Sequence, residues 1–297
     1  MYDFLTTSPW PDYALLDCGH FQKLERFGPY VLARPEPQAL WDPHLPAREW
    51  QRADATFTRA AGSASSGDKG QWHLKPNMAE QWHIAYERPD GLRLKFRLGL
   101  SSFKHVGLFP EQDPNWQFIY NQTKRRRAAP PRVLNLFAYT GAATLAARAA
   151  GADVTHLDSV KQVNFWARDN MTASGLDGVR WLVEDAMKYV HREVRRGARY
   201  QGLILDPPAY GRGPNGEKWQ LEDELNELLK LSQQLLDPDD HFFVVNLYSL
   251  GFSALILDNL VSATFPGPKA VRELGEIYLL DAGQRRLPLG TFCRFAT

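Results

Sequence analysis

The feature that most constrains this chain is a regular alternation of short apolar runs and longer amphipathic stretches beyond residue 131. The apolar runs have the length of β-strands and the stretches between them have the length of helices. Strands that alternate with helices form a mostly parallel sheet whose two faces are covered by those helices. The predicted strands are 132–137, 154–157, 179–183, 202–205 and 242–247, and the predicted helices are 142–150, 160–174, 186–196 and 219–236.

The tail continues the pattern differently, with a predicted helix over 252–263 and two further strands, 276–280 and 290–295, around a polar turn. Such a terminal hairpin is absent from a plain dinucleotide-binding sheet. The predicted fold class is therefore α/β, a doubly wound, Rossmann-like sheet that ends in a β-hairpin.

The amino-terminal part has another texture, with six of the nine tryptophans before residue 121 and short strand-like runs at 30–33 and 92–98. We predict a smaller, mostly-β domain over 1–122, which serves substrate recognition or covers the cofactor. A basic, proline-rich linker follows over 123–131, and the α/β domain occupies 132–297.

Composition narrows the function classes. With 35 basic and 34 acidic residues the net charge is +1, which excludes a protein that coats nucleic acid by charge alone. Cys18 and Cys293 stand far apart without a metal-binding pattern, so we expect no metal and no disulfide framework. No apolar run is long enough to span a bilayer, and a cytoplasmic location is expected. Monomer and dimer both stay open.

In a doubly wound sheet, ligands bind beyond the carboxyl ends of the strands, where the winding reverses. Gly141 follows the first strand and permits close approach of a ligand, while Thr140 is a candidate helix cap. Asp158 ends the second strand 17 residues further on, at a spacing typical of a carboxylate that binds ribose hydroxyls, although it could equally cap the next helix.

The next two strand ends are also acidic. Glu184 and Asp185 follow the third strand, where a carboxylate can accept a hydrogen bond from an adenine amine or cap the helix that begins there. Asp206 ends the fourth strand and precedes Pro207 and Pro208, which hold the backbone extended and remove two amide donors. This rigid rim is the strongest local signal for a substrate site.

These segments, 135–141, Asp158, 184–186 and 206–213, resemble in order the motifs of class I S-adenosylmethionine-dependent methyltransferases. Within that class they resemble the bacterial branch of large-subunit rRNA cytosine-C5 and guanine-N7 methyltransferases, over about residues 90–297. Segment 107–112 is similar to the one that closes over the cofactor in that branch.

The resemblance implies S-adenosylmethionine as cofactor and RNA, in particular rRNA, as substrate. It implies that the cofactor is bound by Gln112, Phe137, Ala138, Thr140, Gly141, Asp158, Ser159, Asp185, Ala186 and Asp206. It also implies that the catalytic residues facing the methyl acceptor are Asp206, Pro207, Pro208 and Tyr210.

The acceptor atom follows from cysteine chemistry. Methylation of pyrimidine carbon-5 requires a thiolate beside the base. In the cytosine-C5 methyltransferases that this chain resembles, the cysteine follows the fifth strand, and the corresponding segment here, 246–251, has no cysteine. We therefore expect transfer to a purine nitrogen, with Tyr210 or Tyr248 stacking on the base. The glycine-rich stretch 211–216 is expected to be a loop that orders with substrate, and Arg212 is a candidate phosphate contact.

A local basic face for RNA is expected from 124–127 together with Arg192, Arg195, Arg196 and Arg199. Three alternatives stay open. They are a methyltransferase acting on protein or a small molecule, a non-catalytic RNA-binding module that retains the cofactor pocket, and a nicotinamide-dependent dehydrogenase. The missing GxGxxG pattern counts against the last.

Overall fold

The computed structural model describes residues 2–59, 69–248, 251–265 and 272–297. The chain divides into two compact units. The first contains Met1–Leu5, Pro114–Ile277 and Gly290–Thr297, and the second contains Thr6–Asp113 and Tyr278–Leu289. The predicted linker, 123–131, falls within the first unit, and the domain boundaries proposed from the sequence stay a prediction.

The first unit is built on an eight-stranded sheet with the order β1-β16-β17-β15-β12-β9-β10-β11. Its strands are β1 (Asp3–Thr6), β9 (Arg132–Leu136), β10 (Asp153–Asp158), β11 (Val179–Val183), β12 (Gly202–Leu205), β15 (Phe242–Leu247), β16 (Glu273–Leu280) and β17 (Arg286–Ala296).

The central strands are parallel. β9 pairs with β10 on one side and with β12 on the other, β10 pairs with β11, and β12 pairs with β15. β17 then pairs antiparallel with β15. β16 is the neighbour of β17 on its other side, which confirms the predicted terminal hairpin. The chain winds outward from β9 to β11 and returns on the opposite side of β9 with β12, so the winding reverses between β9 and β12.

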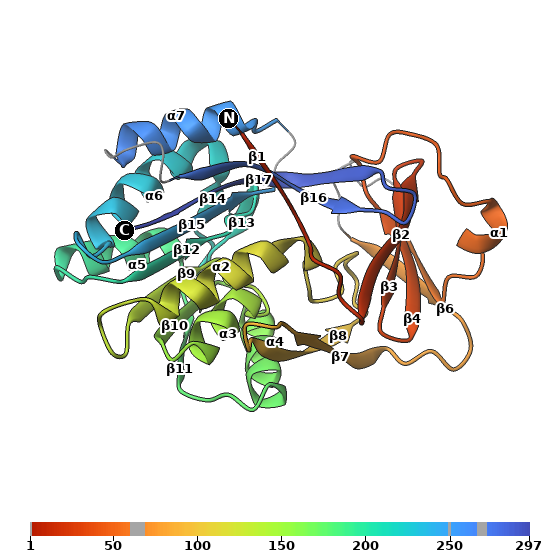
Figure 1. Ribbon diagram of the computed structural model, residues 1–297, viewed down its shortest axis with the longest axis horizontal. Helices are drawn as coiled ribbons and strands as arrows, with labels where there is room; N and C mark the ends of the chain where they lie inside the picture. Colours follow the sequence, from red (N-terminus) through yellow and green to blue (C-terminus); the bar gives the residue numbers. More distant parts are fainter. Residues whose placement is uncertain (1, 60–68, 249–250, 266–271) are drawn as a thin grey trace. The chain divides into compact units, whose positions relative to one another are not determined.

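Helices cover both faces of this sheet (Figure 1). α2 (Asp113–Lys124), α3 (Ala142–Ala149) and α4 (Lys161–Ala173) lie on one side, and α5 (Ala186–Arg195), α6 (Leu221–Leu235) and α7 (Ala254–Thr264) lie on the other. Every residue of β12 and β15 is buried, as expected for strands that are covered on both faces. The fold class predicted from the sequence is confirmed.

The second unit is mostly β. A five-stranded sheet contains β2 (Tyr13–Gly19), β3 (Gln22–Phe27), β4 (Tyr30–Pro35), β5 (Ala55–Arg59) and β6 (Gly70–Leu74), and a separate ribbon contains β7 (Gln81–Glu87) and β8 (Arg93–Gly99). The unit also has the short helix α1 (Ala47–Trp50) and the 3-10 turn η1 (Pro110–Gln112). Trp10, Trp72 and Trp82 are buried in its core, where Trp10 packs edge-on against Tyr86 with ring centroids 5.0 Å apart.

The structure differs from the sequence prediction after β12. Gly211 and Arg212 belong to a strand, whereas we expected a loop over 211–216: β13 (Tyr210–Arg212) and β14 (Lys218–Gln220) form a hairpin, and 213–216 lies in the turn between them. The helix expected from residue 219 begins at Leu221, because Trp219 pairs with Gly211 in that hairpin. No helix within the described ranges is long and apolar enough to cross a membrane.

Candidate functional site

The loop after β9 has an unusual backbone. Gly141 has a φ of 90°, which glycine adopts readily. Phe137 and Tyr139 have φ of 56° and 48°, in the left-handed region that residues with a Cβ rarely adopt. Such residues cost on the order of 1–3 kcal/mol each and concentrate at ligand sites. A Cβ on Gly141 would lie 3.1 Å from the Ala167 Cβ, so the loop passes closely against α4 and a side chain would fit only if α4 shifted by a few tenths of an ångström. This loop occupies the edge where the winding reverses.

Asp158 lies at the carboxyl end of β10, beside the loop. Its Oδ2 accepts a hydrogen bond from the Tyr139 N–H and its Oδ1 accepts one from the Val160 N–H, both at 2.9 Å. Burial raises the pKa of this carboxyl group, and the two N–H donors oppose that shift. The N-cap of α4 is Val160, without a side-chain cap, so Asp158 is not the cap residue of that helix.

These contacts fit the ribose of a nucleoside cofactor. A carboxylate has about four lone-pair sites, and the two N–H donors to Asp158 use two of them. Two sites are therefore left for the two adjacent hydroxyls of a ribose. Ser159 follows directly and is half-buried.

Two further residues of the loop that the sequence analysis assigns to the cofactor, Ala138 and Thr140, are buried. Ala138 donates its N–H to the Leu157 carbonyl over 3.1 Å, which fixes the loop to β10. The Thr140 carbonyl accepts a hydrogen bond from Asn170 Nδ2 at 2.9 Å. Thr140 does not cap α3, because the N-cap is Gly141, which directly follows it. The structure therefore contradicts that part of the expectation.

Asp185 caps α5, since its Oδ1 accepts the Lys188 N–H at 2.9 Å. The capping alternative is confirmed. The second carboxylate oxygen of Asp185 is not used in the cap, so adenine binding by the same side chain stays a prediction. Ala186 is the buried first residue of α5. Glu184 forms a bidentate ion pair with Arg192, with oxygen to nitrogen distances of 2.5 and 2.7 Å.

The fourth strand end places the predicted acceptor residues next to β9, because β12 pairs with β9 directly. Asp206 is half-buried, Pro207 is buried and Pro208 is exposed. Tyr210 is 55% exposed and Tyr248, which follows β15, is 39% exposed. Both tyrosines are thus accessible to a base, and their stacking roles stay predictions.

Gln112 belongs to the second unit, at the end of η1, where its N–H donates to the Phe109 carbonyl at 3.0 Å. Its role in cofactor binding stays a prediction. Among the described residues, no cluster of three His, Cys, Asp or Glu side chains is suited to hold a metal ion.

The sequence prediction missed a buried polar chain behind the loop. Asn135 Nδ2 donates to Thr144 Oγ1 at 2.9 Å, and Thr144 Oγ1 lies 2.8 Å from His156 Nδ1. Burial lowers the pKa of His156 to about 3, and the charge of Arg168 adds to this effect. The only signal in the sequence is the presence of polar residues in otherwise apolar runs.

The sequence prediction also missed Trp219. Its indole Nε1 donates to the Pro208 carbonyl at 2.6 Å, and its ring lies 4.7 Å from the Phe137 ring between centroids. One buried side chain therefore joins the predicted cofactor loop to the predicted acceptor segment.

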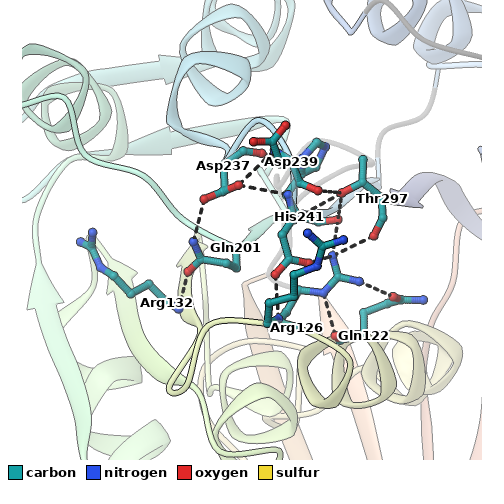
Figure 2. Close-up of polar contacts among 10 residues, drawn as sticks. Gln122, Arg126, Arg132, Gln201, Asp237, Asp239, His241 and Thr297 are labelled. Atoms are coloured by element: carbon teal, nitrogen blue, oxygen red, sulfur yellow. Dashed lines mark hydrogen bonds and ion pairs between the residues drawn. The ribbon is translucent and has the colours of Figure 1, made fainter.

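The prediction of a basic face over 124–127 is wrong for Arg126. Its side chain is 3% exposed, pairs with Asp240 at 3.1 Å and donates to the Thr297 carbonyl and to Gln122 (Figure 2). Three of the other arginines are engaged as well. Arg192 pairs with Glu184, Arg196 pairs with Glu193, and Arg199 donates to the Gln234 carbonyl.

A cavity of about 370 Å³ borders Arg126. It lies near the beginning of β15, whereas the candidate site is at the carboxyl ends of the strands. It is therefore separate from the candidate cofactor site.

A doubly wound sheet with a left-handed loop after its first strand, a half-buried carboxylate after the second and an Asp-Pro-Pro rim after the fourth has the features of a class I methyltransferase. A model of the S-adenosylmethionine-dependent methyltransferase family matches residues 58–260. The chain belongs to this family, and the recognition made from the motifs is confirmed.

Solved structures agree. The SAM-dependent methyltransferase from Agrobacterium tumefaciens is 38% identical with a TM-score of 0.89, over 99% of this chain and 93% of that chain. The protein SMU.776, crystallised in complex with SAH, is 17% identical with a TM-score of 0.67, over 93% of this chain and 71% of that chain. The second likeness supports the fold alone.

Curated relatives carry the name ribosomal RNA large subunit methyltransferase K/L. The protein of this name from Shewanella frigidimarina is 28% identical over 156 residues, which are 51% of this chain and 21% of that protein. The chain thus spans about a fifth of the length of this relative. S-adenosylmethionine is the cofactor of the family to which the chain belongs.

Proposed function

We propose that this protein transfers a methyl group from S-adenosylmethionine to a nitrogen atom of a base in rRNA. The observation that carries the proposal is the Asp206-Pro207-Pro208 rim, which lies at the end of the strand next to the cofactor loop and leads directly to an exposed tyrosine. The names of the curated relatives support rRNA as the substrate class.

The cofactor residues act by positioning. We infer that Asp158 holds the ribose, that Asp185 accepts from the adenine amine, and that the loop over 137–141 contacts the methionine part. When bound, the cofactor supplies a methyl group on a positively charged sulfur. Orienting an acceptor lone pair in line with that methyl group provides much of the rate in such a displacement.

The acceptor residues orient a base. Asp206 and the carbonyls of the proline segment offer acceptors to an exocyclic amine, while Tyr210 offers an aromatic plane. Both cysteines of the chain are buried, and neither lies at a strand end near this rim. A purine nitrogen, which already carries a lone pair, is therefore the acceptor that these residues favour.

The test is nucleoside mass spectrometry of rRNA from a strain that lacks the gene. We expect one methylated nucleoside to disappear and to return with the wild-type gene, while the Asp206→Ala variant does not restore it. An unchanged profile in rRNA and tRNA would refute the RNA assignment and favour a protein or small-molecule acceptor.

A further inference from the structure

The β13–β14 hairpin has two chemically different faces. Its register pairs Tyr210 with Gln220, Gly211 with Trp219 and Arg212 with Lys218. Side chains alternate between the faces of a strand, so the middle pair points one way and the outer pairs point the other. Burial agrees, because Trp219 is buried whereas the side chains of both outer pairs are exposed.

The inner face is fixed to the site. Trp219 donates to the Pro208 carbonyl at 2.6 Å and packs on Phe137, and the Leu221 N–H donates to the Ala209 carbonyl at 3.0 Å. Because Pro208 immediately follows the Asp206-Pro207 rim, the hairpin holds a set position relative to the predicted acceptor site.

The turn of the hairpin is also ordered by contacts. Glu217 accepts hydrogen bonds from the Asn215 N–H at 2.9 Å and from Asn215 Nδ2 at 3.2 Å, and it pairs with Lys188 of α5. The Gly213 N–H donates to the Glu217 carbonyl at 2.8 Å. The one acidic side chain of the hairpin is therefore neutralised by Lys188.

The outer face presents one aromatic ring and two cations. Tyr210 is 55% exposed, and Arg212 and Lys218 are exposed and take part in no ion pair within the described ranges of the chain. Proteins bind single-stranded RNA by combining such cations, which contact phosphates, with aromatic planes on which bases stack. The face therefore offers a nucleotide strand both positive charge for its phosphates and an aromatic ring for a base.

We propose that the outer face of this hairpin binds the RNA strand that carries the acceptor base, with Tyr210 stacking on a base and Arg212 and Lys218 contacting phosphates. The inference rests on the proposed function, because it assumes that the acceptor is part of an RNA. It adds a surface that guides the strand into the Asp206 rim.

The experiment measures the affinity of the purified full chain for a fluorescein-labelled oligoadenylate by fluorescence anisotropy at several salt concentrations. Tyr210→Ala should weaken binding by about 5- to 150-fold, the range for loss of one stacking contact. Tyr210→Phe, which keeps the ring, should bind like the wild type.

The phosphate contacts have a separate signature. The double variant Arg212→Gln, Lys218→Gln should weaken binding and reduce the slope of log affinity against log salt by about 1.4, since each phosphate contact on a single strand contributes about 0.7. A matched control, Arg180→Gln with Lys230→Gln, removes the same charge from exposed positions on β11 and α6, outside every predicted binding surface. It should keep the wild-type slope.

Affinity for S-adenosylmethionine, measured by calorimetry, should stay the same in Arg212→Gln, Lys218→Gln and so show an intact fold. The proposed RNA-binding role of the hairpin is refuted if the hairpin variants bind the oligoadenylate as tightly as the wild type, or if the control variant loses as much affinity as they do. Neither outcome contradicts the proposed RNA methylation. No binding of the oligoadenylate by the wild type overturns the surface as well, and rRNA mass spectrometry then decides the proposed function independently.

Discussion

Acidification should destabilise the first unit through one imidazole. His156 is completely buried behind the loop of 137–141, and burial lowers its pKa from 6.5 to about 3. In the unfolded chain this imidazole regains its ordinary pKa, so at pH values between 6.5 and 3 the unfolded state binds a proton that the folded state does not. The stabilisation is therefore complete above pH 6.5 and is lost as the pH falls toward 3.

The magnitude follows from the difference between the two pKa values. Between pH 7 and pH 5 the linkage relation gives a loss of about 2 kcal/mol in the free energy of unfolding from this group alone. That is a substantial share of the 5–15 kcal/mol by which domains are typically stable. Protonation also removes the hydrogen-bond acceptor at Nδ1, because a protonated imidazole cannot accept a hydrogen bond from the Thr144 hydroxyl.

The assay is urea unfolding, followed by circular dichroism, of the wild type and His156→Gln at pH 7, 6 and 5. Other titrating groups are common to both proteins, so the stability advantage of the wild type over His156→Gln should shrink by about 2 kcal/mol between pH 7 and pH 5. His73→Gln, which removes an exposed imidazole, is the control and should follow the wild type. An advantage that stays constant across this range would refute the reasoning.

Three further predictions concern the site. Asp158→Asn should weaken binding of S-adenosylmethionine in calorimetric titration, because hydrogen bonds to a charged group contribute about 1.5–3 kcal/mol each, and unaltered affinity would mean that the carboxylate only orders the loop. Gly141→Ala should lower thermal stability more than Gly151→Ala: both glycines have positive φ, 90° and 93°, but only Gly141 has Ala167 within 4 Å of a new Cβ. Equal losses in the two variants would show that backbone strain alone matters. Cys293→Ala should leave rRNA methylation intact in the deletion strain, and loss of the modification in a folded variant would contradict transfer to nitrogen.

The parallel sheet was predictable because its strands are buried on both faces and read as continuous apolar runs. The β13–β14 hairpin was not, since three-residue strands are too short to show a period of two. Trp219 fits the apolar spacing of the helix that follows it, but in the folded chain it pairs with Gly211 in the hairpin, and its side chain contacts Phe137 and Pro208.

The candidate site divides in the same way. The carboxylates at the strand ends follow from chain order alone, because all parallel strands point their carboxyl ends to one edge. The contacts of each side chain do not follow from chain order. Asp185 uses one carboxylate oxygen to cap α5. Arg126 is buried because it pairs with Asp240, which only folding brings close to it. A run of basic residues therefore predicts an exposed basic surface only if no acidic residue from another part of the sequence pairs with it in the folded chain.

The choice between a carbon and a nitrogen acceptor depends on the state of the two thiols. Cys293 lies within β17 opposite Val245, and Cys18 is buried in the second unit. Burial raises the pKa of each thiol to about 12. At neutral pH the thiolate fraction is then on the order of 10⁻⁵, whereas attack on carbon-6 of a pyrimidine requires the thiolate itself. Neither cysteine offers a useful fraction of thiolate, which supports the proposal that the methyl group goes to a ring or amine nitrogen that already carries a lone pair.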